Sequence, residues 1–85
     1  MTNEFTHFLR RRRQELAMTQ SELAAACGLS SISITLIEAG RRRLALERIP
    51  RLAEVLQVPP GELCLLALRC RYPKLTEVLT TGAAL

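Results

Sequence analysis

The sequence predicts an all-α domain of five helices, with a short sixth helix near its C-terminal end. The chain has 85 residues, which fits a single domain. Hydrophobic residues make up 48% of it and aromatic residues only 4%, so the core must be aliphatic, as suits helices packed on helices. Capping residues, glycines and prolines then divide the chain into segments of helix length.

The first two helices are expected over residues 4–16 and 20–27. Apolar side chains of the first segment follow roughly one helical face, at Phe5, Phe8, Leu9 and Leu16. Before the second segment, Thr19 and Glu22 have the spacing of a Thr-x-x-Glu capping box. Gly28 then supplies a left-handed stop, so the second helix has a signal at each end.

The third helix is expected over residues 31–39, and the fourth begins close to Glu47. Ser30 caps the third helix and Gly40 ends it. These two signals outweigh the β-branched residues between them, which on their own favour a strand. Pro50 lacks an N–H and clashes deep inside a helix, so we expect it in the first turn of the fourth helix.

The C-terminal part is expected to contain two further helices. Residues 59–61, Pro-Pro-Gly, break the chain before a fifth helix over residues 62–69, which is apolar on nearly every side. Tyr72-Pro73 is a second break, before a short sixth helix over residues 74–80. Either this tail folds over the fifth helix or a second copy of the chain covers it.

A second copy is the expectation that we favour. Isologous packing of two copies is the commonest form of small oligomer. We therefore expect residues 1–70 to form the main domain and residues 71–85 an extension that supports dimerisation. The expected interface residues are Leu65, Leu66, Leu68, Leu75 and Leu79.

The charge indicates an anionic partner. The net charge is +4, and all but one of the basic residues are arginine. The planar guanidinium group matches phosphate oxygens and guanine edges. Two runs stand out, residues 10–13 and residues 41–43. Successive residues of a helix point about 100° apart, so the first run cannot serve a single surface.

Several residue types argue against other classes of function. There is no Asp, one His and no glycine-rich phosphate loop, so no enzyme activity is expected. Cys27, Cys64 and Cys70 have no CxxC spacing, so we expect reduced, buried thiols, no metal site and no cofactor. His7 is expected on the surface. The longest apolar run is too short to span a bilayer and no signal-peptide pattern occurs, so a cytoplasmic location without membrane contact is expected.

The order and spacing of several short motifs resembles the Cro/phage-repressor (Xre-like) helix-turn-helix family. The motifs lie within about residues 5–66, at Met18–Ala24, Gly28–Ser30, Ile34, Ile37–Arg42, Leu46-Glu47, Leu52–Leu56, Val58 and Glu62-Leu63. The resemblance implies a compact five-helix repressor-type domain in which the second and third helices form the helix-turn-helix. It also implies a third helix that reads DNA, and a dimer on a two-fold symmetric operator.

The resemblance and the charge pattern together indicate a set of site residues. The reading face implied by the family is Ser31, Ile32, Ser33, Thr35 and Leu36. The expected phosphate contacts are Thr19, Gln20, Arg11, Arg41, Arg42 and Arg43. The family also implies an internal salt bridge between Arg13 and Glu38. Ile32 and Leu36 depart from the polar residues of many relatives; they either contact thymine methyl groups or complete the core or face a partner protein.

The sequence therefore predicts a repressor-like transcriptional regulator that binds double-stranded DNA in a sequence-specific way, as a homodimer on a palindromic operator. An antitoxin and a restriction–modification controller are variants that the residues do not separate. A protein-interaction module on the same fold, without DNA binding, is the alternative from another class. A toxin or polymerase partner is left open.

Overall fold

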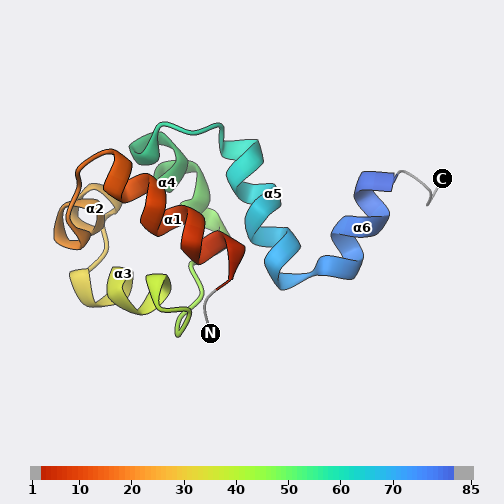
Figure 1. Ribbon diagram of the computed structural model, residues 1–85, viewed down its shortest axis with the longest axis horizontal. Coiled ribbons are helices and arrows are strands. Elements are labelled where there is room, and N and C mark those ends of the chain that lie inside the picture. The colour runs from red at the N-terminus through yellow and green to blue at the C-terminus, as the bar shows by residue number, and fades with distance from the viewer. Residues whose placement is uncertain (1–2, 82–85) are drawn as a thin grey trace.

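A computed structural model describes residues 3–81, apart from the side chains of Thr76 and residues 79–81. Within that part it contains six α-helices, one short 3₁₀-helix (η1) and no strand, so the all-α prediction with a sixth helix is confirmed (Figure 1). The elements are α1 Glu4–Glu15, α2 Gln20–Cys27, α3 Ser31–Glu38, η1 Leu46–Arg48, α4 Ile49–Leu56, α5 Pro60–Arg71 and α6 Pro73–Thr81.

Side-chain caps fix where the first helices begin and end. The Thr19–Glu22 capping box forms as predicted, and α2 has the predicted bounds. A second capping box, which the sequence analysis missed, starts α1: the Thr6 backbone N–H donates to Asn3 Oδ1 at 3.0 Å and the Asn3 N–H donates to Thr6 Oγ1 at 2.8 Å. Ala17, with φ of 56°, follows the end of α1 in the left-handed region.

The prolines set the starts of α4 and α5. Pro50 lies in the first turn of α4, as predicted, after the 3₁₀ turn η1. A break separates α4 from α5 as predicted, but it covers residues 57–59 and not 59–61, because α5 already begins at Pro60 and continues to Arg71. A proline in the first helical position loses no hydrogen bond, since the first N–H groups of a helix have no partner within it.

An aliphatic core lies between α1 and α5, as the composition predicts. The largest apolar side chains with almost no exposed area are Leu9, Leu23, Ile34, Ile49, Leu56 and Leu63. Each contributes about 1.5–3 kcal/mol by leaving water. Because these residues come from five different helices, the core fixes α2 and α3 against the rest of the domain.

The sixth helix stands outside this core. Figure 1 shows α6 folding back from the end of α5 and projecting away from α1 to α4, and the molecule measures 44 × 25 × 21 Å along its principal axes. Leu65, Leu66 and Leu68 on α5 are half-buried, and Leu75 on α6 is 54% exposed. The predicted interface residue Leu79 has its side chain outside the described residues.

Other expectations concern individual residues. Cys27 is buried, but Cys64 and Cys70 are only half-buried, because α5 faces solvent on one side; the expectation of three buried thiols is therefore wrong for those two. His7 is exposed. Between residues 3 and 81, no helix is long and apolar enough to cross a membrane.

Candidate nucleic-acid interface

A tight turn joins α2 to α3. Gly28 adopts φ of 72°, a left-handed conformation that glycine takes without steric cost. The Leu29 N–H donates to the Ala24 carbonyl at 2.8 Å, which closes the end of α2. Ser30, two residues after Gly28, caps α3. Its Oγ accepts a hydrogen bond from the Ser33 N–H at 3.1 Å. The connection between the two helices is therefore short, and hydrogen bonds fix both of its ends.

One face of α3 is sealed against the body. Ile34 and Ile37 are buried in the core, as their spacing predicts. Glu38 lies on the same side, and its side chain is only 1% exposed. A carboxylate this deeply buried needs charged or hydrogen-bonding partners, because desolvation of an isolated charge is very costly.

Three helices meet at the Glu38 carboxylate. From α1, Arg13 donates two hydrogen bonds, from Nε to Oε2 at 2.7 Å and from Nη2 to Oε1 at 3.1 Å. Arg10 Nε lies 3.8 Å from Oε1. From α2, Gln20 Nε2 donates to Oε1 at 3.0 Å. A paired guanidinium and carboxylate form a strong and directional contact, so this cluster fixes the orientation of α3.

The opposite face of α3 is open at its N-terminal end. Ser31 is exposed and Ile32 is 69% exposed. Thr35 is also exposed, but its hydroxyl lies within hydrogen-bond distance of Gln20 Oε1 and of the Ser31 carbonyl, both at 2.9 Å. Ser33 and Leu36 are half-buried, and Ser33 Oγ accepts from the Ser30 hydroxyl. Of the predicted reading face, Ser31 and Ile32 are thus the exposed residues whose side chains are not used in hydrogen bonds within the protein.

The start of α2 lies next to this face, because Gln20 bonds to Thr35. The first N–H groups of a helix lack partners within the helix and carry its positive dipole end. Thr19 Oγ1 accepts from one of them, the Glu22 N–H, at 3.0 Å. The Gln20 side chain, predicted as a phosphate contact, uses both its amide groups inside the protein, which positions the start of α2 against α3.

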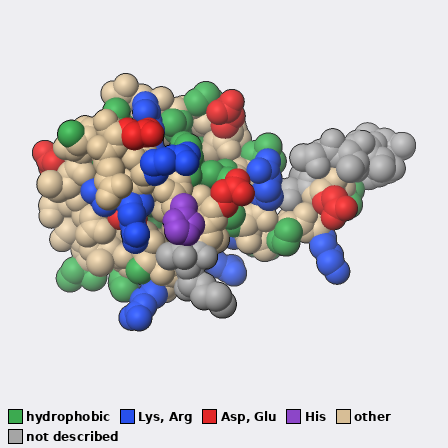
Figure 2. Space-filling view, viewed as in Figure 1, with side chains coloured by type: hydrophobic (Ala, Val, Ile, Leu, Met, Phe, Trp, Pro, Cys, Tyr) green, Lys and Arg blue, Asp and Glu red, His purple; other side chains and the backbone are tan. Residues whose placement is uncertain are grey.

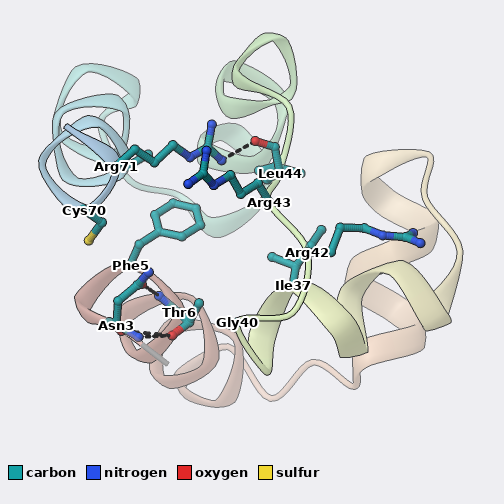
Figure 3. A pocket seen from close by; sticks show the side chains of 11 residues that line it. Asn3, Phe5, Thr6, Ile37, Gly40, Arg42, Arg43, Leu44, Cys70 and Arg71 are labelled. Carbon is teal, nitrogen blue, oxygen red and sulfur yellow. Dashed lines mark hydrogen bonds between the residues drawn. The ribbon is translucent and has the colours of Figure 1, made fainter. Parts of the chain in front are cut away.

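The arginines after α3 diverge. Arg42 Nη1 donates to Ser33 Oγ at 3.0 Å, so its side chain lies along α3. Arg43 extends the other way, toward Arg71 (Figure 3), and all three arginines are among the residues that line one pocket. In the described part of the chain, Arg41 and Arg43 are the arginines whose side chains make no hydrogen bond, ion pair or ring contact. Arg11, on α1, lies over the Phe8 ring with Cζ 5.8 Å from its centroid.

Other arginines serve the ends of helices, a role that the sequence analysis missed. Arg48 Nη1 donates to the Cys27 carbonyl at 3.3 Å and Arg51 Nε to the Ala26 carbonyl at 3.1 Å, at the end of α2. Arg12 Nε donates to the Leu56 carbonyl at 2.9 Å, at the end of α4. These bonds give part of the positive charge a structural role. Figure 2 shows basic side chains spread over the face of the body that is turned to the viewer.

Burial also sets the chemistry of the thiol beside these arginines. Removal from water raises the pKa of the Cys27 thiol, and the positive charges of Arg51 and Arg48 oppose that rise. The raised pKa keeps the sulfur protonated at neutral pH, which makes it a poor nucleophile. Within residues 3–81, no cluster of three or more His, Cys, Asp or Glu side chains is placed to hold a metal ion.

Comparison with known proteins identifies the same segment. A family model described as helix-turn-helix matches residues 9–63, more than half of the chain. The match starts in α1 and ends in α5, so it includes the Gly28 turn, all of α3 and the loop that follows. Comparisons with curated proteins and with solved structures each give no match.

Proposed function

This chain belongs to the Cro/C1-type (Xre-like) helix-turn-helix family of DNA-binding transcriptional regulators, and on that premise we propose that it binds a specific double-stranded DNA sequence as a homodimer and acts as a repressor-like regulator. The proposed operator is palindromic, because two identical domains related by a two-fold axis read two identical half-sites.

The observation that carries the proposal is the exposed N-terminal end of α3. In a helix-turn-helix, the first residues of the second helix contact base edges in the major groove. Ser31 and Ile32 occupy that position with exposed side chains. Ser31 offers one hydroxyl to a base or a phosphate, and Ile32 offers an apolar surface that suits the methyl group of thymine.

Phosphate contacts are proposed on both sides of α3. Arg41 and Arg42 leave its C-terminal end, and Arg42 is held along the helix by Ser33. On the other side, Thr19 and the start of α2 present a helix N-terminus, which favours an anion. Such contacts position the protein on the duplex and make binding sensitive to salt, but they carry little sequence information.

The dimer is proposed to form through α5 and α6. Apolar side chains there remain accessible in the single chain: Leu75 is 54% exposed, Tyr72 48% and Val78 45%. Leu65 and Leu68 are half-buried on the neighbouring helix. A second copy that covers this surface places two α3 helices on one assembly, with half-sites about 34 Å apart if they lie one DNA turn from each other.

Selection of bound duplexes from a random pool tests the function. We expect a palindromic consensus, and we expect Ile32→Ala to change which sequences are recovered. Arg42→Ala should instead weaken binding to all sequences and lower the dependence of log affinity on log salt by about one unit. Sequence-specific reading would be contradicted if the recovered duplexes showed no consensus and if both substitutions weakened binding equally for all sequences.

A protein-interaction module on the same fold is the second candidate. The specific observation that favours it is Ile32, an apolar side chain that is 69% exposed at the centre of the proposed reading face. Ser33 and Thr35 are also already hydrogen-bonded within the protein. A gel shift with mixed genomic duplex at several salt concentrations separates the two candidates. Absence of binding at low salt would favour the interaction module.

A further inference from the structure

A pocket of about 210 Å³ lies outside the reading face of α3. Its walls come from the start of α1, the loop between α3 and η1, and the C-terminal half of α5 (Figure 3). Neither Ser31 nor Ile32 lines it. The pocket is therefore separate from the proposed base-reading residues, and of the proposed phosphate contacts only Arg42 also lines it.

The apolar wall of the pocket is already in place. Phe5, Ile37, Leu44 and Ala67 line it, and all four are buried members of the core. They come from α1, α3, α5 and the loop, so several elements fix the shape of this wall. Binding pockets for small molecules typically combine such an apolar lining with a few converging polar groups.

The polar groups of the pocket are hydrogen-bond donors. Arg43 and Arg71 both line it, and Figure 3 shows their side chains extending toward each other over the Phe5 ring. Arg71 donates one hydrogen bond to the Leu44 carbonyl, which holds its guanidinium in place and leaves further N–H groups. Asn3 uses its side-chain oxygen to cap α1, so its amide nitrogen is a third donor.

No carboxylate is among the lining residues, whereas three arginines are: Arg43, Arg71 and Arg42, the last of which donates to Ser33 Oγ. Glu4, which follows Asn3 in the chain, pairs instead with Arg69 at 3.5 Å. Glu38 is bound by Arg13 at 2.7 Å. Two like charges held near each other repel, and an anion between them replaces that repulsion with two charge-assisted bonds.

We propose that this pocket binds a small organic carboxylate, with the carboxylate between Arg43 and Arg71 and a compact apolar body against Phe5, Ile37, Leu44 and Ala67. The size sets the class of ligand. The volume exceeds the roughly 150 Å³ of a cavity that holds benzene and is smaller than the roughly 300–1,000 Å³ of sites for drug-sized molecules. A ligand with one ring or a short branched chain fits these limits. In this proposal Arg43 binds the carboxylate, whereas the sequence analysis predicts that it contacts a DNA phosphate.

Calorimetric titration with benzoate, in a low-chloride buffer and without DNA, tests the proposal. We expect saturable binding with a dissociation constant of about 1 mM or below. Arg43→Ala should weaken it about tenfold or more, since bonds to a charged group are lost. Arg41→Ala is the matched control, because Arg41 is exposed on the same loop and does not line the pocket; it should bind like the wild type.

Two further probes separate the parts of the pocket. Benzamide keeps the ring and lacks the charge, so it should bind at least about tenfold more weakly than benzoate. Cys70 lines the pocket, so bound benzoate should slow its alkylation, measured in a Cys64→Ser variant. In the denatured variant, benzoate should leave the rate of Cys70 alkylation unchanged. Absence of benzoate binding, equal binding by Arg43→Ala, or equal binding of benzamide would each overturn the proposal, whether or not the protein binds DNA.

Discussion

The α2–α3 end and the α5–α6 end of the molecule are stabilised in different ways. At the α2–α3 end, a capping box, a serine cap, a left-handed glycine and the buried Glu38 carboxylate fix the two helices through bonds within the chain. At the α5–α6 end, apolar side chains such as Leu75 stay exposed, and α6 projects from the body. The first region is complete in one chain, whereas the second presents the kind of surface that proteins cover with a partner.

This difference matches the two tasks of the proposed dimeric regulator. Sequence reading needs side chains held in a fixed orientation, and the polar bonds around α3 supply it. The proposed pairing of two copies needs apolar area that is accessible before association, and α5 and α6 expose such area. The following predictions test this division, from the largest expected effect to the smallest.

Removal of the Glu38 carboxylate should have the largest effect. Glu38→Ala leaves Arg13 partly buried without its charged partner, and we expect a loss of about 3–5 kcal/mol in the free energy of unfolding. Urea denaturation followed by circular dichroism measures it. Glu47→Ala is the control, because Glu47 is exposed, and it should change stability by less than about 0.5 kcal/mol.

A double variant sharpens the same test. Arg13→Ala/Glu38→Ala should lose clearly less stability than the sum of the two single losses, because each single variant leaves an unpaired group. Additive losses would mean that the pair does not connect α1 to α3 energetically.

At the other end, Leu75→Glu should separate the proposed dimer without unfolding the chain. Its side chain is more than half exposed in the single chain, so a charge there costs little until a second copy covers it. We expect dimerisation to weaken by about 2 kcal/mol. Sedimentation equilibrium measures this against Lys74→Glu, which replaces a positive with a negative charge at the neighbouring exposed position. A wild-type chain that sediments as a monomer at every concentration would contradict the proposed dimer.

The same substitution at two glycines should have opposite signs. Gly28→Ala places an alanine at φ of 72°, which costs about 1–2 kcal/mol. An added Cβ would meet Arg48 Nη1 at 3.9 Å, an ordinary contact, so the loss comes from the backbone. Gly61→Ala lies within α5 with nothing within 4 Å, and it should stabilise by about 0.5–1 kcal/mol. Thermal unfolding of both variants checks the pair, and equal signs would contradict the backbone argument.

The smallest effect concerns rates of thiol reaction. Burial raises the pKa of the Cys27 thiol, so it stays protonated to higher pH than an ordinary cysteine. Folding is therefore favoured below the ordinary thiol pKa and loses that contribution as the pH rises through the raised value. We expect Cys27 to react with iodoacetamide more slowly than Cys64 and Cys70, measured by peptide mass spectrometry; faster labelling of Cys27 would contradict its burial.

Local signals in the sequence account for most of the fold. The bounds of α2 follow from Thr19, Glu22 and Gly28 alone, since a cap and a left-handed stop act within a few residues. The start of α5 is harder to predict from the sequence, because a proline marks either a break or the first turn of a helix. The left-handed turns at Ala17 and Gln57 had no glycine to indicate them.

The site was less accessible to sequence reasoning, because its bonds join distant residues. The exposed position of Ile32 follows from helical spacing, because two residues place it on the opposite side of α3 from the buried Ile34. In contrast, the bonds from Arg48 and Arg51 to the end of α2 cross more than twenty residues of chain, and composition does not indicate them. An arginine that caps a helix and one that meets a phosphate look alike until the fold places them.

The Glu38 cluster also affects the thermodynamics of recognition. A helix fixed in advance by one carboxylate and two neighbouring helices keeps its shape when it enters a groove, so little conformational entropy is lost on docking. The heat capacity of complex formation should then follow the surface removed from water, without the large additional decrease that accompanies folding on contact. Discrimination between operators would depend on rigid fit, and a mismatched base could not be accommodated by a change in the helix.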